Sequence, residues 1–327
     1  MSRALPVLRE IQSQLGGSLP FERFMCEALY NSEFGYYTKT IRDVGRSGDF
    51  STFATLGNSL AEVLVHWISG HSIRDVIEVG PGNGQLAMST LKRLGWWKRM
   101  GLRYHLVDVD GPLRTAREKR LRGYRVLQHS SMTEALRTVN GQALIFSNEL
   151  PDAFPCRVFE NTPEGWREVY VRIGESAIEE ILRESTLPDS SVFHRPHLVG
   201  QRVEVHESYR RWMESWASEW TSGSMLTIDY GDTLPNLYHR RPRGTLRGYA
   251  HHQRLESPQI LQAPGRIDLT ADVNFSDLEN WGAALGWKTI RHTTLAQLLP
   301  VDSDWQIREA AAAFRVLEQG SGTRMPA

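Results

Sequence analysis

The sequence predicts an α/β protein whose core is a mostly parallel, Rossmann-like sheet. Two observations predict this fold class. Short apolar runs alternate with helical stretches of about 10–15 residues, which is typical of βαβ units. In addition, a glycine-rich turn, Gly80-Pro81-Gly82-Asn83-Gly84, stands between the first such run and the helix after it. A turn of this kind joins the first strand to the first helix in doubly wound folds.

The strands and helices follow from local patterns. Strands are predicted where short apolar runs occur, at 75–79, 104–109, 143–147, 225–231 and 287–294. Helices are predicted from apolar residues at helical spacing, at 21–29, 57–68, 85–94, 113–122, 212–220, 277–285 and 304–319. The tryptophans at 212, 216 and 220 recur every four residues and indicate a core-facing stripe.

Two segments depart from the βα alternation. The runs 157–160 and 166–173 flank a turn rich in polar residues, which predicts an antiparallel hairpin inserted into the core. The stretch 234–265 is polar and rich in proline and arginine, and we expect a long loop there. Long loops in compact domains are often functional lids.

Composition and charge limit the class of protein. The chain has 327 residues, 40% of them hydrophobic and 23% charged, which is ordinary for a folded globular protein. The 38 basic and 38 acidic residues balance, so we expect neither a nucleic acid partner nor membrane insertion. Cys26 and Cys156 form no CxxC pair, and no metal site is expected. We expect a cytoplasmic protein, or one of the mitochondrial matrix only if a transit peptide is missing from this chain.

The turn at 78–84 indicates a nucleotide cofactor, because glycines let the backbone approach a ligand closely. The dinucleotide fingerprint needs its third glycine three residues after the second, and Gln85 stands there instead. Glu78 disfavours a pyrophosphate beside the loop. It favours S-adenosylmethionine, which carries a positive sulfonium and an ammonium group. We therefore predict that Glu78, Gly80, Gly82 and Gly84 bind S-adenosyl-L-methionine; the alternative is a tight turn without a ligand.

Other candidate residues follow the second and third strands. Asp108 ends the second strand, the usual position of an acceptor for ribose hydroxyls. Asn148, Glu149 and Asp152 follow the third strand, and ligands bind outside the carboxyl ends of such strands. A pair of carboxylates matches the planar fork of a guanidinium group, so these three are candidate catalytic residues. The alternative makes Asp152 a helix N-cap and Asn148 a turn residue.

Several motifs, in this order along the chain, resemble the MidA-like family of class I S-adenosylmethionine-dependent methyltransferases. They lie at 21–25, 35–37, 48–50, 78–84, 148–155, 228–231, 244–246 and 268–270. The resemblance implies the class I methyltransferase fold, and the best-known activity of the family is methylation of a protein arginine. It also implies that Gly48 and Asp49 belong to a loop that closes over the cofactor.

The chain departs from the family pattern at two places on the acceptor side. The family usually has a Ser/Thr-Pro-Glu segment after Phe50, whereas 51–56 contains no carboxylate here. Asp272 and Asn274 stand where the family tends to have a histidine and an aspartate. A small-molecule methyltransferase, or a cofactor-binding assembly factor with little turnover, therefore remains an alternative to a protein arginine methyltransferase.

These elements predict four segments. Residues 1–70 form an N-terminal helical cap with the cofactor-closing loop, and 71–155 with 224–300 form the Rossmann-like cofactor-binding core. Residues 156–223 form an inserted hairpin and helix for the substrate, and 301–327 form a C-terminal helix and tail. The expected partner is a protein substrate. Sequence alone names neither the methyl acceptor nor the oligomeric state.

Overall fold

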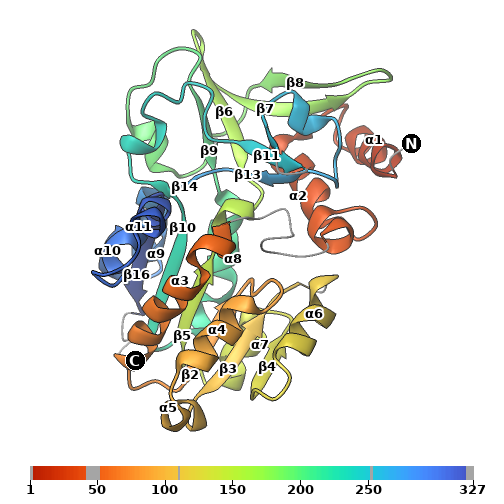
Figure 1. Cartoon of the computed structure of the whole chain (residues 1–327). Coiled ribbons are helices and arrows are strands. Elements are labelled where there is room, and N and C mark those ends of the chain that lie inside the picture. The colour runs from red at the N-terminus through yellow and green to blue at the C-terminus, as the bar shows by residue number, and fades with distance from the viewer. Residues whose placement is uncertain (1–2, 42–51, 110, 251–252, 322–327) are drawn as a thin grey trace. The chain divides into compact units, whose positions relative to one another are not determined.

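The computed structural model describes residues 3–41, 52–109, 111–250 and 253–321. The chain divides into two compact units, and Figure 1 follows it by colour from the N-terminus to the C-terminus. The hairpin unit contains Met1–Ile41, Pro151–Arg211 and Asp232–Asp277. The Rossmann-like unit contains Arg42–Leu150, Trp212–Gly231 and Leu278–Ala327. These boundaries differ from the four predicted segments, since the helix α3 (Thr52–Ser69) belongs to the Rossmann-like unit.

A mostly parallel sheet forms the Rossmann-like unit, which confirms the predicted fold class. Its strands follow the order β15-β16-β10-β5-β2-β3-β4. The parallel strands are β2 (Asp75–Val79), β3 (Arg103–Val107), β4 (Val126–His129), β5 (Leu144–Asn148) and β10 (Ser224–Asp232). The antiparallel strands are β15 (Lys288–Thr294) and β16 (Phe314–Gly320). Sequence patterns had not indicated β4.

The strand order reverses at β2. From β2 the chain first adds β3 and β4 on one side, and it then returns to add β5 and β10 on the other. In open α/β sheets, ligands bind in the crevice outside the carboxyl ends of the strands at such a reversal. The connection after β2 and the end of β5 flank this point, so both belong to the candidate site.

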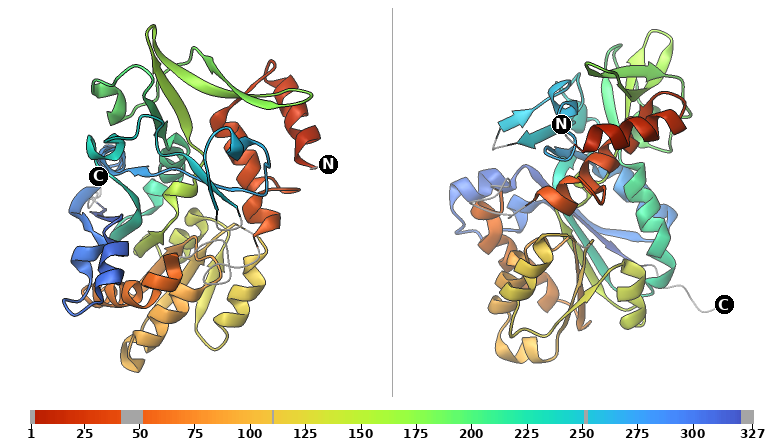
Figure 2. Two further views of the ribbon diagram at one scale, coloured as in Figure 1. Left: turned by 45° about the horizontal axis from the view of Figure 1, so that its top comes forward. Right: turned by 90° about the vertical axis from the view of Figure 1, so that its right-hand side faces the viewer.

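Helices cover both faces of this sheet. The unit contains α3 and the helices α4 (Gln85–Arg93), α5 (Trp96–Met100), α6 (Leu113–Arg120), α7 (Met132–Thr138), α10 (Leu295–Leu298) and α11 (Trp305–Ala311). In the right-hand view of Figure 2, α3 and α4 lie on one face and α7 on the other. Alternate strand residues, such as Val76, Leu144 and Phe146, pack against α3 and α4 in one buried core. Two further helices, α8 (Glu207–Trp216) and α9 (Phe275–Ala284), each include a boundary between the units.

The C-terminal segment corrects one prediction. The helix expected over 304–319 ends at Ala311, and β16 follows as a strand between β10 and β15. Phe314 and Val316 join the core beneath α3 and α4, while the neighbouring Leu317 is buried as well. A strand buried on both faces has no alternation of polar and apolar residues, so its sequence can be mistaken for a helix.

The hairpin unit is built on antiparallel strands. The predicted hairpin is present as β6 (Arg157–Thr162) and β7 (Gly165–Ile173). Its sheet follows the order β1-β7-β6-β9, with β8 paired to β7, and the other strands are β1 (Leu19–Pro20), β8 (Ile178–Arg183) and β9 (Arg202–Val205). The helices of this unit are α1 (Ala4–Gln14) and the predicted amphipathic helix α2 (Phe21–Tyr30).

The polar segment expected as a long loop instead contains strands. These are β11 (Arg247–Ala250) and β12 (Gln253–Leu255), and β11 also pairs with β13 (Asp268–Thr270). A short strand, β14 (Val273–Asn274), follows. The side chains of Thr245 and Arg247 are buried, which the polar composition of the segment did not indicate.

Candidate functional site

The glycine loop after β2 has a backbone that requires glycine. Gly80, Gly82 and Gly84 have φ values of +68°, +52° and +77°. Left-handed backbone costs other residues roughly 1–2 kcal/mol each. The Gly80 amide donates to the carbonyl of Val107 at 2.9 Å, and a Cβ on Gly80 would lie 2.9 Å from Leu150 Cδ1. Glycine is therefore needed in this loop for two reasons: the backbone has positive φ values, and at Gly80 a side chain would collide with Leu150.

Two arginines of α6 bind the carbonyl groups of this loop. Arg117 Nη1 donates to the carbonyl of Gly82 at 2.9 Å, and Arg120 Nη1 donates to that of Asn83 at 2.7 Å. Arg117 also forms an ion pair with Asp108, the predicted acceptor for ribose hydroxyls. One buried guanidinium thus contacts both the glycine loop and the acidic residue after β3.

Glu78 is buried beneath the loop. Its side chain is on the same face of the sheet as Tyr104, whose hydroxyl donates to Glu78 Oε2 at 2.7 Å. Burial raises the pKa of Glu78 to about 7, although the Tyr104 hydrogen bond and the charge of Arg117 oppose this shift. A carboxyl group poised near neutrality ionises readily when a positive charge arrives beside it.

Asn148 and Glu149 lie at the carboxyl end of β5, next to β2 in the sheet. Glu149 has a φ of +51°, and its amide donates to the carbonyl of Ile228 on β10 at 3.0 Å. Asn148 Nδ2 donates to Glu149 Oε1 at 3.2 Å. A glutamate in the left-handed region is strained, and such strain clusters at functional sites.

Asp152 belongs to the hairpin unit, in the short 3₁₀ helix Pro151–Ala153. Thr270 Oγ1 donates to its carboxylate at 2.8 Å, and the Ala271 amide donates to its carbonyl at 3.2 Å. Burial raises the pKa of Asp152 to about 6, against the effects of the Thr270 hydrogen bond and the charge of Arg247. No α-helix begins at Asp152, so the predicted alternative of a helix N-cap does not apply.

The two residues of one acceptor-side departure, Asp272 and Asn274, form contacts within the hairpin unit. Asp272 pairs with Arg247 at 2.6 Å and also with Arg241. Asn274 Nδ2 donates to Ser191 Oγ at 3.1 Å. The predicted cofactor residues Gly48 and Asp49, and Ser51 among the residues of the other departure, lie outside the described residues.

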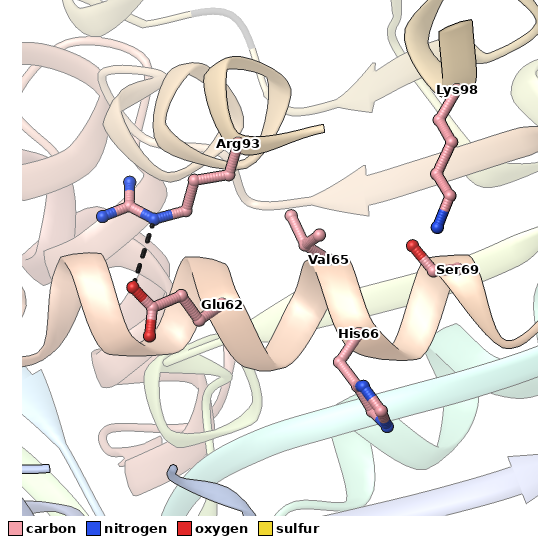
Figure 3. Close-up of a pocket in the computed structure, with 6 residues that line it drawn as sticks. All are labelled: Glu62, Val65, His66, Ser69, Arg93 and Lys98. Atoms are coloured by element: carbon pink, nitrogen blue, oxygen red, sulfur yellow. Dashed lines mark ion pairs between the residues drawn. The ribbon is translucent and has the colours of Figure 1, made fainter. Parts of the chain in front are cut away.

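An open groove of about 440 Å³ lies along α3. It is lined by Glu62, Val65, His66 and Ser69 of α3, with Arg93 of α4 and Lys98 of α5, and Arg93 pairs with Glu62 at 3.5 Å (Figure 3). None of the predicted site residues lines this groove. Among the residues that the structure describes, no group of three or more His, Cys, Asp or Glu side chains could hold a metal ion. In the same residues, no helix is long and apolar enough to cross a membrane.

Sequence patterns missed Arg117, Arg120 and Tyr104. The first two stand three residues apart on a helix that is rich in arginine, a spacing that brings side chains to one face. This spacing could have indicated that Arg117 and Arg120 act on the same neighbouring segment. Tyr104 carries no such signal, since an aromatic residue in a β-strand is most often part of the core.

The strand order, the reversal at β2 and the glycine loop define a nucleotide-binding α/β fold of the methyltransferase class. A model of a family of S-adenosyl-L-methionine-dependent methyltransferases (Methyltransf_28) matches residues 55–293, and the chain belongs to this MidA-like family. It is therefore an S-adenosylmethionine-dependent methyltransferase. Family membership confirms S-adenosyl-L-methionine as the cofactor predicted from Glu78 and the glycine loop.

Curated relatives resemble the chain over most of its length. It is 27% identical to "Protein arginine methyltransferase NDUFAF7, mitochondrial" of Danio rerio, over 83% of this chain and 71% of the relative. Identity to the Homo sapiens protein of the same name is 28%, over 84% of this chain and 68% of the relative. Because these relatives are named as mitochondrial proteins, the expectation of a cytoplasmic protein is contradicted.

Solved structures support the fold. A protein from Burkholderia thailandensis, crystallised with S-adenosyl-homocysteine, is 24% identical and superposes with a TM-score of 0.81. The match covers 99% of this chain and 93% of that one. A native crystal structure of a protein from the same organism gives a TM-score of 0.77 at 22% identity, over 99% of this chain and 92% of that one.

We expect Gly82→Ala to weaken cofactor binding by at least about tenfold, because the loop approaches the ligand closely and the variant strains its backbone. The strain should also lower the free energy of unfolding by about 1–2 kcal/mol. Calorimetric titration with S-adenosylhomocysteine and denaturant unfolding measure the two effects. Gly123→Ala is the control, since Gly123 has a φ of +91° and no atom within 4 Å of an added Cβ. Equal losses of affinity in both variants would contradict the assignment.

We expect Glu78 to make stability depend on pH. The folded protein holds the Glu78 proton more tightly than the unfolded chain, since the pKa rises from 4.5 to about 7. The stabilising contribution of Glu78 is therefore full below pH 4.5 and is lost as the pH rises through 7. Relative to Glu78→Gln, the wild type should lose about 3 kcal/mol of unfolding free energy between pH 4 and pH 8.

Urea unfolding of both proteins across this pH range measures the difference. Glu118→Gln serves as control, because half of the Glu118 side chain is exposed and its removal should leave the pH dependence unchanged. Parallel stability curves for the wild type and Glu78→Gln would show that Glu78 ionises without cost in the folded state.

Proposed function

We propose that this methyltransferase transfers a methyl group to a guanidinium nitrogen of an arginine in a protein substrate. The observation that carries the proposal is the strained Glu149, whose carboxylate follows β5 beside the point where the strand order reverses. A carboxylate binds a guanidinium by charge-assisted hydrogen bonds with matching planar geometry. The names of the curated relatives, which are 27–28% identical, support the same substrate class.

In this proposal the cofactor binds at the carboxyl ends of β2 and β3. Gly80, Gly82 and Gly84 form the loop that approaches it, Glu78 favours its positive charge, and Asp108 accepts from its ribose hydroxyls. The family resemblance assigns Gly48 and Asp49 to the cofactor as well, and both lie outside the described residues. The residues fit such a group, because the loop carbonyls of Gly82 and Asn83 are already engaged by α6 and the nearby carboxylates favour a cation.

When bound, S-adenosylmethionine supplies a methyl group on a cationic sulfur, which keeps the electron pair of the broken bond while the acceptor nitrogen gains the methyl group and loses a proton. Glu149 orients that nitrogen and stabilises the charge of the guanidinium. Asn148 restrains Glu149 through the hydrogen bond at 3.2 Å. Asp152, in the hairpin unit, is proposed as a catalytic residue from its place in the sequence alone. Catalysis then consists mostly of positioning, with reacting atoms about 3–3.5 Å apart.

We expect Glu149→Gln to lower single-turnover methyl transfer by roughly tens- to a thousandfold. The substitution is nearly isosteric but removes the charge that holds the guanidinium, and losing a charged hydrogen bond at a buried site costs about 2–5 kcal/mol. Cofactor affinity should change little, because the cofactor contacts lie at the glycine loop and Asp108. Single-turnover assays beside calorimetric titration measure both quantities, and Glu118→Gln is the matched control.

The acceptor is found by incubating the protein with radiolabelled cofactor and cell extract. Labelled methylarginine in an acid hydrolysate of one protein band supports the proposal. Label in a small molecule would assign the chain to small-molecule methylation instead. Cofactor binding without any labelled product would favour an assembly factor with little turnover. Unchanged transfer by Glu149→Gln would remove Glu149 from the mechanism.

A further inference from the structure

We propose that Arg117 is a positioning residue that couples the glycine loop to Asp108, so that recognition of the cofactor ribose depends on it. The inference rests on the proposed role of Asp108 as the acceptor for ribose hydroxyls. It assigns a function to an arginine of α6 that binds no reacting atom and that the sequence motifs do not include.

The contacts of Arg117 join three consecutive strands of the sheet at their carboxyl ends. Nη1 donates to the carbonyl of Gly82, in the loop after β2, and pairs with the carboxylate of Asp108, after β3. Nε and Nη2 donate to Gln128 Oε1 on β4, at 3.3 and 3.1 Å. Each of the three guanidinium nitrogens therefore has a partner, and the partners come from the segments that bound the predicted adenosine site.

Burial makes these contacts strong. The side chain of Arg117 is only 4% exposed, and a guanidinium in such a place needs a nearby negative charge. Asp108 supplies that charge, yet 21% of its own side chain remains exposed. Arg117 thus fixes the direction of the Asp108 carboxylate, while part of that carboxylate stays open to a ligand.

The planar shape of arginine is essential to this role. Its fork reaches the loop carbonyl, the carboxylate and the Gln128 amide oxygen at the same time, whereas the single ammonium of lysine cannot span them. Packing fixes the side chain further, because a Cβ on Gly84 would lie 3.0 Å from Arg117 Cγ. We therefore expect Arg117→Lys to keep the charge but to lose the coupling.

Arg120 provides a matched comparison on the same helix. It also binds the glycine loop, through the carbonyl of Asn83 at 2.7 Å. In the part of the chain that the structure describes, the ion pair with Asp108 is formed by Arg117 and not by Arg120. If binding of a loop carbonyl were the whole function, the two arginines would behave alike. If the link to Asp108 matters, only Arg117 affects ribose recognition.

The experiment measures dissociation constants for S-adenosylhomocysteine and for its 2′,3′-dideoxy analogue by calorimetry. Wild type should prefer the hydroxyl-bearing ligand by about tenfold or more, as expected for a hydrogen bond to a charged acceptor. Arg117→Lys should reduce this preference to less than about threefold, and Arg120→Lys should leave it unchanged. A general loosening of the site would weaken the binding of both ligands equally and would leave the ratio of their dissociation constants unchanged.

If Arg117→Lys keeps the wild-type ratio of the two dissociation constants, the inference is wrong. Tighter binding of S-adenosylhomocysteine by this variant would also contradict it, because Arg117 would then compete with the ribose for Asp108. If that variant does not fold, Gln128→Leu removes two of the hydrogen bonds of Arg117 without altering the loop. An unchanged ratio of dissociation constants in Gln128→Leu would also contradict the inference. A wild type without any preference would refute the ribose role of Asp108 itself. Methyl transfer to arginine is measured in a separate assay. Failure of the proposed arginine methylation is therefore distinguishable from failure of the role proposed for Arg117 or for Asp108.

Discussion

The chain passes from β2 to α4 through a turn of five residues, and the backbone of that turn strongly favours glycine at 80, 82 and 84. Three left-handed residues in so short a span would cost any other sequence several kcal/mol. Once the turn is made, the loop carbonyls of Gly82 and Asn83 are positioned to accept from the arginines of α6. The turn also lies where the strand order reverses, between β3 and β5. The candidate site therefore depends on one backbone conformation, which the sheet places and α6 holds.

Charge gives this site its preference for a cation. Glu78, Asp108 and Glu149 lie at or near the carboxyl ends of three adjacent strands, and the environments of Glu78 and Asp108 differ. Glu78 is buried beside Tyr104 and titrates near neutrality, so a bound positive charge can draw it into the ionised form. Asp108 is held by Arg117 and is partly exposed. Glu149 stands at a strained position, and strain of this kind clusters at functional sites.

Short apolar runs and helical spacing in the sequence predicted most strands of the central sheet and most of the helices around it, but not β4 or β16. Helix α2 and the β6–β7 hairpin follow from spacing and turn residues, as does the loop after β2. The sequence of strand β16 predicts a helix because both faces of the strand are buried, which removes the alternation that identifies a strand. The position of Glu149 could be predicted from its place after a strand. Its left-handed backbone and the contacts of Arg117 could not, since both arise from pairings between segments far apart in the chain.

The central claim is that the glycine loop and its carboxylates select S-adenosylmethionine rather than a dinucleotide. Isothermal titration of the full chain with S-adenosylmethionine, and separately with NAD, tests it most directly. We expect saturable binding of S-adenosylmethionine at one site and no heat of binding with NAD, because Gln85 replaces the third glycine of the dinucleotide fingerprint and Glu78 disfavours a pyrophosphate. Binding of NAD without binding of S-adenosylmethionine would contradict it.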